Sequence, residues 1–252
     1  MVDIVTKGKP KLDDPVFIEG LPGVGNVGKL AVEHLNDELT AKPLAEVYCK
    51  DFPPQVFIDP DGTVKLVKND IRYVKKGTKS GRDLILLTGD YQGLTSAGQY
   101  DLVTDVLDLL ETHGCKELYT LGGYGLGRMV TEPAVLGAAI DKKSVTRMKK
   151  HGVEFREDEP GGGIVGASGL FLGLGKVRGM TGACLMGETS GYLVDPTSAQ
   201  AVLRVLESLL SLKIDYSRLD DKARDMDKIA QQLKEMERKA SERSPDDLRY
   251  IG

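Results

Sequence analysis

Val16-Phe-Ile-Glu-Gly-Leu-Pro-Gly-Val-Gly-Asn-Val-Gly28 begins the α/β pattern of this chain. It opens on a short apolar run, Val16 to Gly20, which is typical of a buried strand. A glycine-rich turn follows, and apolar residues then recur at positions 27, 30, 31, 32 and 35, as on one face of a helix. The stretch therefore predicts a strand, a tight turn and an amphipathic helix in direct succession.

The same alternation of strands and helices continues along the chain. The apolar run from Asp83 to Asp90 predicts a central strand, and a helix is expected from Ser96 to about Thr112. Antiparallel strands between residues 46 and 74, with a hairpin turn at Asp59-Pro-Asp-Gly62, are expected at one sheet edge. Further strands are predicted at residues 117–121, 134–140 and 182–187, and further helices at 142–151, 164–174 and 197–212.

These elements predict an α/β fold of three layers, in which helices cover both faces of a mixed, mostly parallel sheet. No linker, repeat or low-complexity tract interrupts the chain before residue 213. We therefore expect residues 1–212 to form a single α/β domain and residues 213–252 to form a C-terminal helical extension.

The extension carries a long charged helix, expected from Leu219 to Arg243. Most of its residues are charged, but its apolar residues follow a heptad-like spacing. An isolated helix of this kind needs a partner surface, which either self-association or packing on the main domain would supply. The residues of this stripe are Leu219, Met226, Ile229, Leu233 and Met236.

The last nine residues, Ser-Pro-Asp-Asp-Leu-Arg-Tyr-Ile-Gly252, form a tail with an unusual composition. Its proline ends the helix. A dispensable terminus is usually small and polar, whereas this one carries Leu248, Tyr250 and Ile251. Two interpretations stay open. Either these side chains and the Gly252 carboxylate enter a partner's pocket, or the tail packs on its own domain or inside an oligomer.

Composition limits the classes of function. The chain has 252 residues, of which 40% are apolar, and a net charge of −4, which argues against a nucleic-acid partner. No apolar run approaches the ~18 residues of a membrane span, and the N-terminus does not resemble a signal peptide. The widely spaced Cys49, Cys115 and Cys184 predict reduced thiols, so we expect a cytoplasmic protein without a membrane partner.

Glycine-containing loops follow four predicted strands and define a candidate pocket. The first has the Gly-x-Gly-x-x-Gly spacing of a dinucleotide-binding turn, and all four are expected at the carboxyl rim of the sheet, where such folds bind ligands. In a dinucleotide-binding fold an acid usually follows this turn by about twenty residues, at the end of the second strand. Glu46 lies near that spacing, but it starts a strand instead of ending one. The sequence therefore favours the alternative, a tight turn that lets helix and sheet pack closely. The candidate pocket residues are Gly23, Gly25, Asn26, Gly28, Asp90, Gly123, Tyr124 and Glu188.

A search for catalytic groups finds no constellation. His34, His113 and His151 lie within or at the ends of predicted helices, with no spacing typical of a metal site. No Gly-x-Ser-x-Gly motif is present, and Asp90 and Glu188 alone do not define acid–base chemistry. We expect no enzyme activity, no metal and no cofactor. The alternative is a nucleotide-binding or small-molecule enzyme that uses the glycine loops.

Several motifs together resemble the archaeal PAC2 family, which is related to the eukaryotic proteasome assembly chaperones. The resemblance covers roughly residues 10–212 and implies a fold like that of purine nucleoside phosphorylases, in a homo-oligomer. The motifs that carry it are Glu19-Gly-Leu-Pro-Gly-Val-Gly-Asn-Val-Gly28, Phe52-Pro-Pro54, Thr88-Gly-Asp90, Leu121-Gly-Gly-Tyr-Gly125 and Gly163-Ile-Val-Gly-Ala-Ser-Gly-Leu170.

The resemblance also implies a role for the tail. Archaeal members are similar to factors that dock on the α-ring of the 20S proteasome through a C-terminal hydrophobic-Tyr-X peptide, whose carboxylate pairs with a lysine. This implies a non-enzymatic assembly chaperone or activator with the 20S α-ring as partner. The tail departs from the strict motif, because Tyr250 is third from the end and Ile251 holds the expected tyrosine position. Leu248 or Ile251 supplies the apolar contact if the register is shifted.

Overall fold

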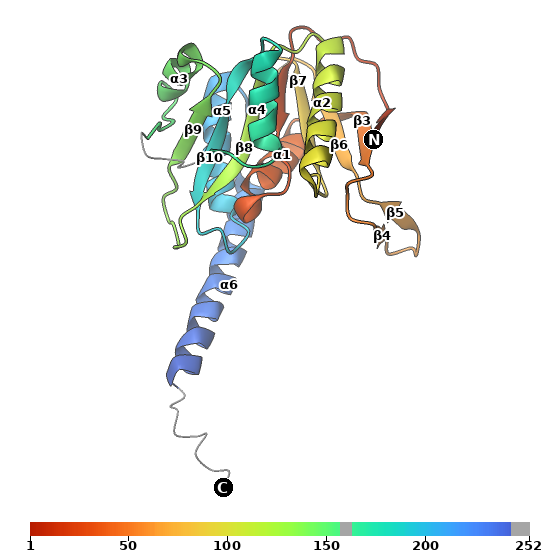
Figure 1. Ribbon diagram of the computed structural model, residues 1–252. Helices are drawn as coiled ribbons and strands as arrows, with labels where there is room; N and C mark the ends of the chain where they lie inside the picture. The colour runs from red at the N-terminus through yellow and green to blue at the C-terminus, as the bar shows by residue number, and fades with distance from the viewer. Residues whose placement is uncertain (157–162, 243–252) are drawn as a thin grey trace.

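The computed structural model describes residues 1–156 and 163–242 (Figure 1). Its main sheet has the strand order β1-β3-β6-β7-β2-β8-β10-β9 within these residues. The four central strands, β7, β2, β8 and β10, run parallel, and the strands on both sides of them pair antiparallel. The bounds are β1 Val2–Thr6, β2 Val16–Glu19, β3 Lys42–Cys49, β6 Asn69–Val74, β7 Leu84–Gly89, β8 Glu117–Gly125, β9 Val135–Ala139 and β10 Thr181–Thr189.

Helices cover both faces of this sheet and produce three layers (Figure 1). The central strand β7 shows why, since Leu84 and Leu86 enter one core cluster and Ile85 and Leu87 enter the other. A strand segment that is buried on both faces is apolar at successive positions, which explains the run from Leu84 to Leu87. On one face lie α1 (Val27–Glu38), α3 (Lys142–Lys149) and α5 (Pro196–Leu210), and on the other α2 (Ser96–Thr112) and α4 (Ala167–Val177).

The opening unit has the predicted order of strand, turn and helix. A short 3-10 turn, η1 (Val24–Asn26), links β2 to α1, and Asn26 takes the left-handed conformation with φ of 50°. Gly28, in the first turn of α1, lies directly against β8. A Cβ atom at this position would stand 2.1 Å from the Leu121 carbonyl oxygen, so the helix can approach the sheet only with glycine here.

The expectation of a three-layer, mixed α/β fold is confirmed, with parallel strands in the centre and antiparallel strands at the edges. The α2 bounds match the predicted ones. Two local predictions were wrong, because residues 188–189 continue strand β10 and residues 122–125 continue strand β8 instead of forming loops. Both segments stay in the sheet because β8 and β10 pair with each other as far as Thr189, opposite Gly125. Strand β1 was missed, since its short, partly polar sequence gives a weak pattern.

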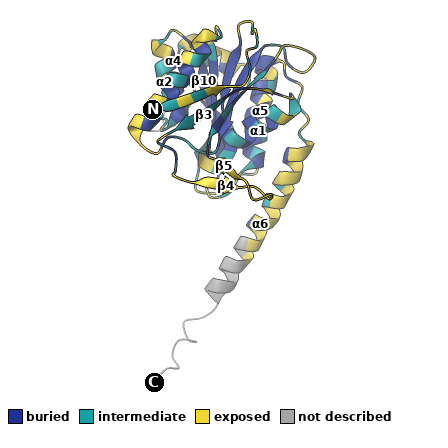
Figure 2. Cartoon of the chain, turned by 90° about the vertical axis from the view of Figure 1, so that its right-hand side faces the viewer, coloured by how far each residue is buried: buried dark blue, intermediate teal, exposed yellow. Residues whose placement is uncertain are grey.

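A small hairpin and a long helix extend from the main body (Figure 1). The hairpin, β4 (Val56–Ile58) with β5 (Val64–Leu66), surrounds the predicted turn at residues 59–62. The helix α6 (Ser217–Glu242) contacts the body at its first turns and then projects away from it (Figure 2). We call α6 the stalk. None of the described helices is long and apolar enough to cross a membrane.

Candidate functional site

The glycine loops do come together at the carboxyl rim, but they do so by packing on one another. A Cβ atom on Gly25 would lie 2.8 Å from the Thr189 hydroxyl oxygen, and one on Gly123 would lie 2.3 Å from the Val24 carbonyl oxygen. With Gly28 against Leu121, these glycines are explained by close contact between the turn and the ends of β8 and β10. Gly23 has no such close neighbour, and ligand binding at this rim stays a prediction.

The candidate polar residues of the rim already have structural partners. The Asp90 carboxylate accepts a hydrogen bond from the Lys68 backbone N–H at 3.0 Å. Glu188 lies within β10, where it pairs with Arg156 at 2.9 Å and accepts from the Ala134 N–H at 3.2 Å. Two strands, β2 and β8, separate β7 from β10, so Asp90 and Glu188 are too far apart to act as an acid–base pair. Tyr124 packs against the core cluster beneath α4.

Glu19 is a buried carboxyl group that the sequence analysis did not single out. It ends β2 and is fully buried, with Oε1 accepting from the Leu21 N–H at 2.9 Å and Oε2 hydrogen-bonded to the Ser168 hydroxyl at 2.9 Å. Burial raises the pKa of this carboxyl to about 7, against the lowering effect of the two hydrogen bonds. An acid at the end of an otherwise apolar strand was the signal available in the sequence.

The root of the stalk is fixed to α1 and α5. His34 of α1 donates from Nε2 to the Asp215 carbonyl oxygen at 2.7 Å, and its ring stacks on Tyr216 with centroids 6.2 Å apart. The Tyr216 hydroxyl donates to Glu207 of α5 at 3.0 Å. Leu219 is buried in the main core with 1% exposure. The buried histidine therefore has a structural role at the start of the stalk.

The apolar stripe of the stalk changes its environment along the helix. Leu219 is buried, Met226 is half-buried, and Ile229 is 43% exposed. Packing on the main domain therefore buries the start of the stripe. The Ile229 side chain is only partly buried by the residues that the structure describes. The structure does not describe the side chains of Leu233 and Met236. It also does not describe the tail residues Leu248, Tyr250, Ile251 and Gly252.

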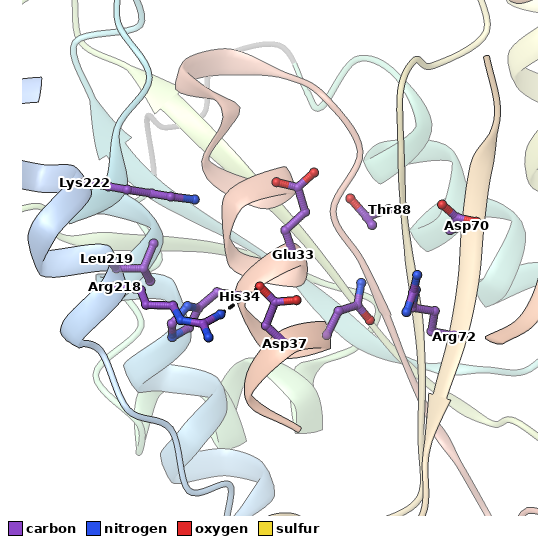
Figure 3. A pocket seen from close by; sticks show the side chains of 10 residues that line it. Glu33, His34, Asp37, Asp70, Arg72, Thr88, Arg218, Leu219 and Lys222 are labelled. Atoms are coloured by element: carbon purple, nitrogen blue, oxygen red, sulfur yellow. Dashed lines mark hydrogen bonds and ion pairs between the residues drawn. The ribbon is translucent and has the colours of Figure 1, made fainter. Parts of the chain in front are cut away.

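A cavity of about 330 Å³ lies beside the stalk root (Figure 3). Figure 3 shows Arg218 and Lys222 of α6 on one side, Asp70 and Arg72 of β6 on the other, and Glu33 and Asp37 of α1 between them. Four segments far apart in the sequence build it, from α1, β6, β7 and α6, so no local motif predicted it. Among the described residues, no group of three or more His, Cys, Asp or Glu side chains could hold a metal ion.

Comparison with known proteins identifies relatives over nearly the whole chain. The uncharacterized protein MJ1210 of Methanocaldococcus jannaschii is 39% identical over 261 residues, covering 100% of this chain and 99% of that protein. The crystal structure of Pyrococcus furiosus PbaB, an archaeal proteasome activator, is 42% identical with a TM-score of 0.87. The alignment covers 92% of this chain and 98% of PbaB.

Pyrococcus furiosus PbaA, an archaeal homolog of proteasome-assembly chaperone, is a more distant structural relative. It is 25% identical with a TM-score of 0.76, covering 96% of this chain and 94% of PbaA. The sequence model of the PAC2 family matches residues 17–234, which include the sheet apart from β1, the helices around it and most of the stalk. On this match and on the similarity to MJ1210, the chain belongs to the PAC2 family.

Proposed function

We propose that this protein is a non-enzymatic proteasome-binding factor that docks on the α-ring of the 20S proteasome through its C-terminal tail. The observation that carries the proposal is the stalk, which leaves the body and runs away from it toward the C-terminal residues (Figure 1). The similarity to PbaB, described as a proteasome activator, supports the choice of partner. Such a partner also agrees with the cytoplasmic location expected from the reduced cysteines.

The polar groups of the rim support a role without catalysis. Asp90 is engaged with the Lys68 backbone, and Glu188 is engaged with Arg156. A general acid or base needs a carboxyl that can reach a substrate proton, whereas these two serve to join neighbouring segments. We therefore favour binding over chemistry, with no cofactor required.

Self-association through the stalk is the second part of the proposal. Ile229 continues the stripe that begins at the buried Leu219, yet it is 43% exposed on a helix that leaves the body. A helix with one apolar stripe is stabilised when a second helix covers it, as in a coiled coil. A homo-oligomer joined in this way would present several tails at once and gain avidity for a ring with several equivalent pockets.

Replacing Ile229 with aspartate should weaken the oligomer. The change would place a charge in the apolar seam between stalks, where it would have to lose its hydration. We expect sedimentation velocity to show a shift toward monomer for Ile229→Asp, with the domain still folded by circular dichroism. Lys228→Gln, at the adjacent exposed position of α6, is the matched control and should keep the wild-type distribution. An unchanged distribution for Ile229→Asp would exclude the stalk as the association surface.

Deleting residues 246–252 should abolish binding to the proteasome while leaving the oligomer intact. We expect the full-length protein to co-sediment with purified archaeal 20S proteasome and the deletion variant to remain in the supernatant. Tyr250→Ala should lose most of the binding, because it removes the tail's aromatic anchor, whereas Asp247→Asn should retain it. Equal co-sedimentation of the full-length and truncated proteins would contradict docking through the tail.

A further inference from the structure

The cavity at the stalk root lies between the stalk and the sheet. Lys222 lies on the second turn of the stalk, and Arg72 lies on β6 of the sheet (Figure 3). Helix α1 lies between them and contributes Glu33 and Asp37. The volume, about 330 Å³, suits a small molecule. A ligand that reaches both walls would connect the stalk to the sheet.

The carboxylates of this cavity each have a cationic partner. Asp37 pairs with Arg218 at 3.2 Å, and Asp70 pairs with Lys68 at 2.8 Å. Glu33 lies 3.4 Å from the ammonium group of Lys29. Lys68 also pairs with Glu46, but Glu46 has a second cation in Lys7 at 2.8 Å, so the negative charge that lines the cavity is balanced within the chain.

Two cationic side chains that line the cavity lack such a partner among the described residues. Neither Arg72 nor Lys222 forms an ion pair with any residue that the structure describes. The half-buried Arg72 guanidinium makes one long hydrogen bond, 3.4 Å to the Ala41 carbonyl oxygen, and keeps further N–H donors free. The cavity thus has a surplus positive charge on each of its two opposite walls.

We propose that this cavity binds an elongated small molecule with an anionic group at each end, one held by Arg72 and the other by Lys222. Arginine binds phosphate or carboxylate through paired N–H donors, and lysine adds a point charge at the other end. Sugar bisphosphates and long dicarboxylates share this chemistry. Because Lys222 belongs to the stalk and Arg72 to the sheet, the bound molecule would add a further connection between the stalk and the body. Binding of such a molecule does not require the proteasome.

Isothermal titration calorimetry with two probes, fructose 1,6-bisphosphate and suberate, tests this proposal and distinguishes phosphate from carboxylate ends. We expect at least one probe to bind saturably, and fructose 6-phosphate to bind about tenfold more weakly than the bisphosphate if phosphate is preferred. Arg72→Gln and Lys222→Gln should each weaken the preferred probe by about tenfold or more. Lys228→Gln, on the same helix but outside the cavity, should bind like wild type.

Thermal unfolding and hydrogen exchange distinguish the loss of a binding site from a general loss of structure in the variants. All variants should keep the wild-type thermal midpoint without ligand, and the bound probe should slow hydrogen exchange at the first turns of α6 in the wild type. No saturable binding of either probe would overturn the proposal. Binding that is unaffected by Arg72→Gln or by Lys222→Gln would also overturn it, because the molecule would then lie elsewhere or touch one wall alone.

Discussion

Replacing Gly28 with alanine should destabilise the fold by more than about 3 kcal/mol, the upper end of what overpacking costs in protein interiors. The added Cβ would lie 2.1 Å from the Leu121 carbonyl oxygen and 3.3 Å from the Gly20 Cα. Both neighbours are backbone atoms of central strands or of the turn after them, so neither can rotate away. Helix α1 would have to move off the sheet, which would also disturb the stalk root held by His34.

A second glycine of the same fold provides the control for this experiment. Gly173 lies in the interior of α4, is exposed, and has no atom within 4 Å of a Cβ built on it. Alanine there should stabilise the protein by about 0.5–1 kcal/mol, because it reduces the freedom of the unfolded chain. Urea denaturation of both variants measures the two effects. Similar stabilities for Gly28→Ala and the wild type would contradict the close packing of the turn on β8.

Replacing Glu19 with glutamine should stabilise the protein at pH 8 and leave its stability nearly unchanged at pH 4. The ordinary glutamate pKa is 4.5, and burial raises the pKa of Glu19 to about 7. A glutamine can still accept from the Leu21 N–H and donate to the Ser168 hydroxyl, so the two hydrogen bonds survive the substitution. The variant therefore removes the cost of a buried charge and little else.

The direction of the pH dependence follows from proton binding. Between pH 4.5 and 7 the unfolded chain loses the Glu19 proton while the folded chain keeps it, so the free energy of unfolding of the wild type falls across this window. Relative to Glu19→Gln, the wild type should lose on the order of 3 kcal/mol of unfolding free energy across this window, with no further change above pH 7. Urea denaturation of both proteins at pH 4, 6 and 8 measures it. A difference that stays constant with pH would show that Glu19 titrates normally.

The elements with strong periodicity could be predicted from the sequence alone. Residues 84–87 are all apolar because β7 is buried on both faces, and the helical spacing after Ser96 gave the bounds of α2. Glycine runs were harder to interpret. The Gly-Gly-Tyr-Gly segment at residues 122–125 has the composition of a loop, yet pairing with β10 keeps it in a strand. Tertiary contacts overrode local composition at that point.

The sites could be predicted only in part, for a related reason. The stripe of the stalk is a local pattern, so spacing alone predicts Leu219 and Ile229 as its members, and its role in self-association stays a prediction. The cavity at the stalk root depends instead on β6, α1 and α6 meeting in space, so Arg72 and Lys222 share no motif. The role of a glycine also depends on its neighbours. Gly28 has the spacing of a phosphate-binding turn, but its environment shows that contact with Leu121 excludes a side chain there.

Site-specific photo-crosslinking from position 250 would show which surface the tail contacts when the protein meets the proteasome. Tyr250 would be replaced by benzoylphenylalanine, which keeps an aromatic ring, and the full-length oligomer would be irradiated with archaeal 20S proteasome. Docking through the tail predicts crosslinks to α subunits, none to β subunits, and their loss when an excess of a free peptide of residues 244–252 competes. Crosslinks confined to other copies of this chain would mean that the tail is buried in the oligomer, and would contradict the proposed function.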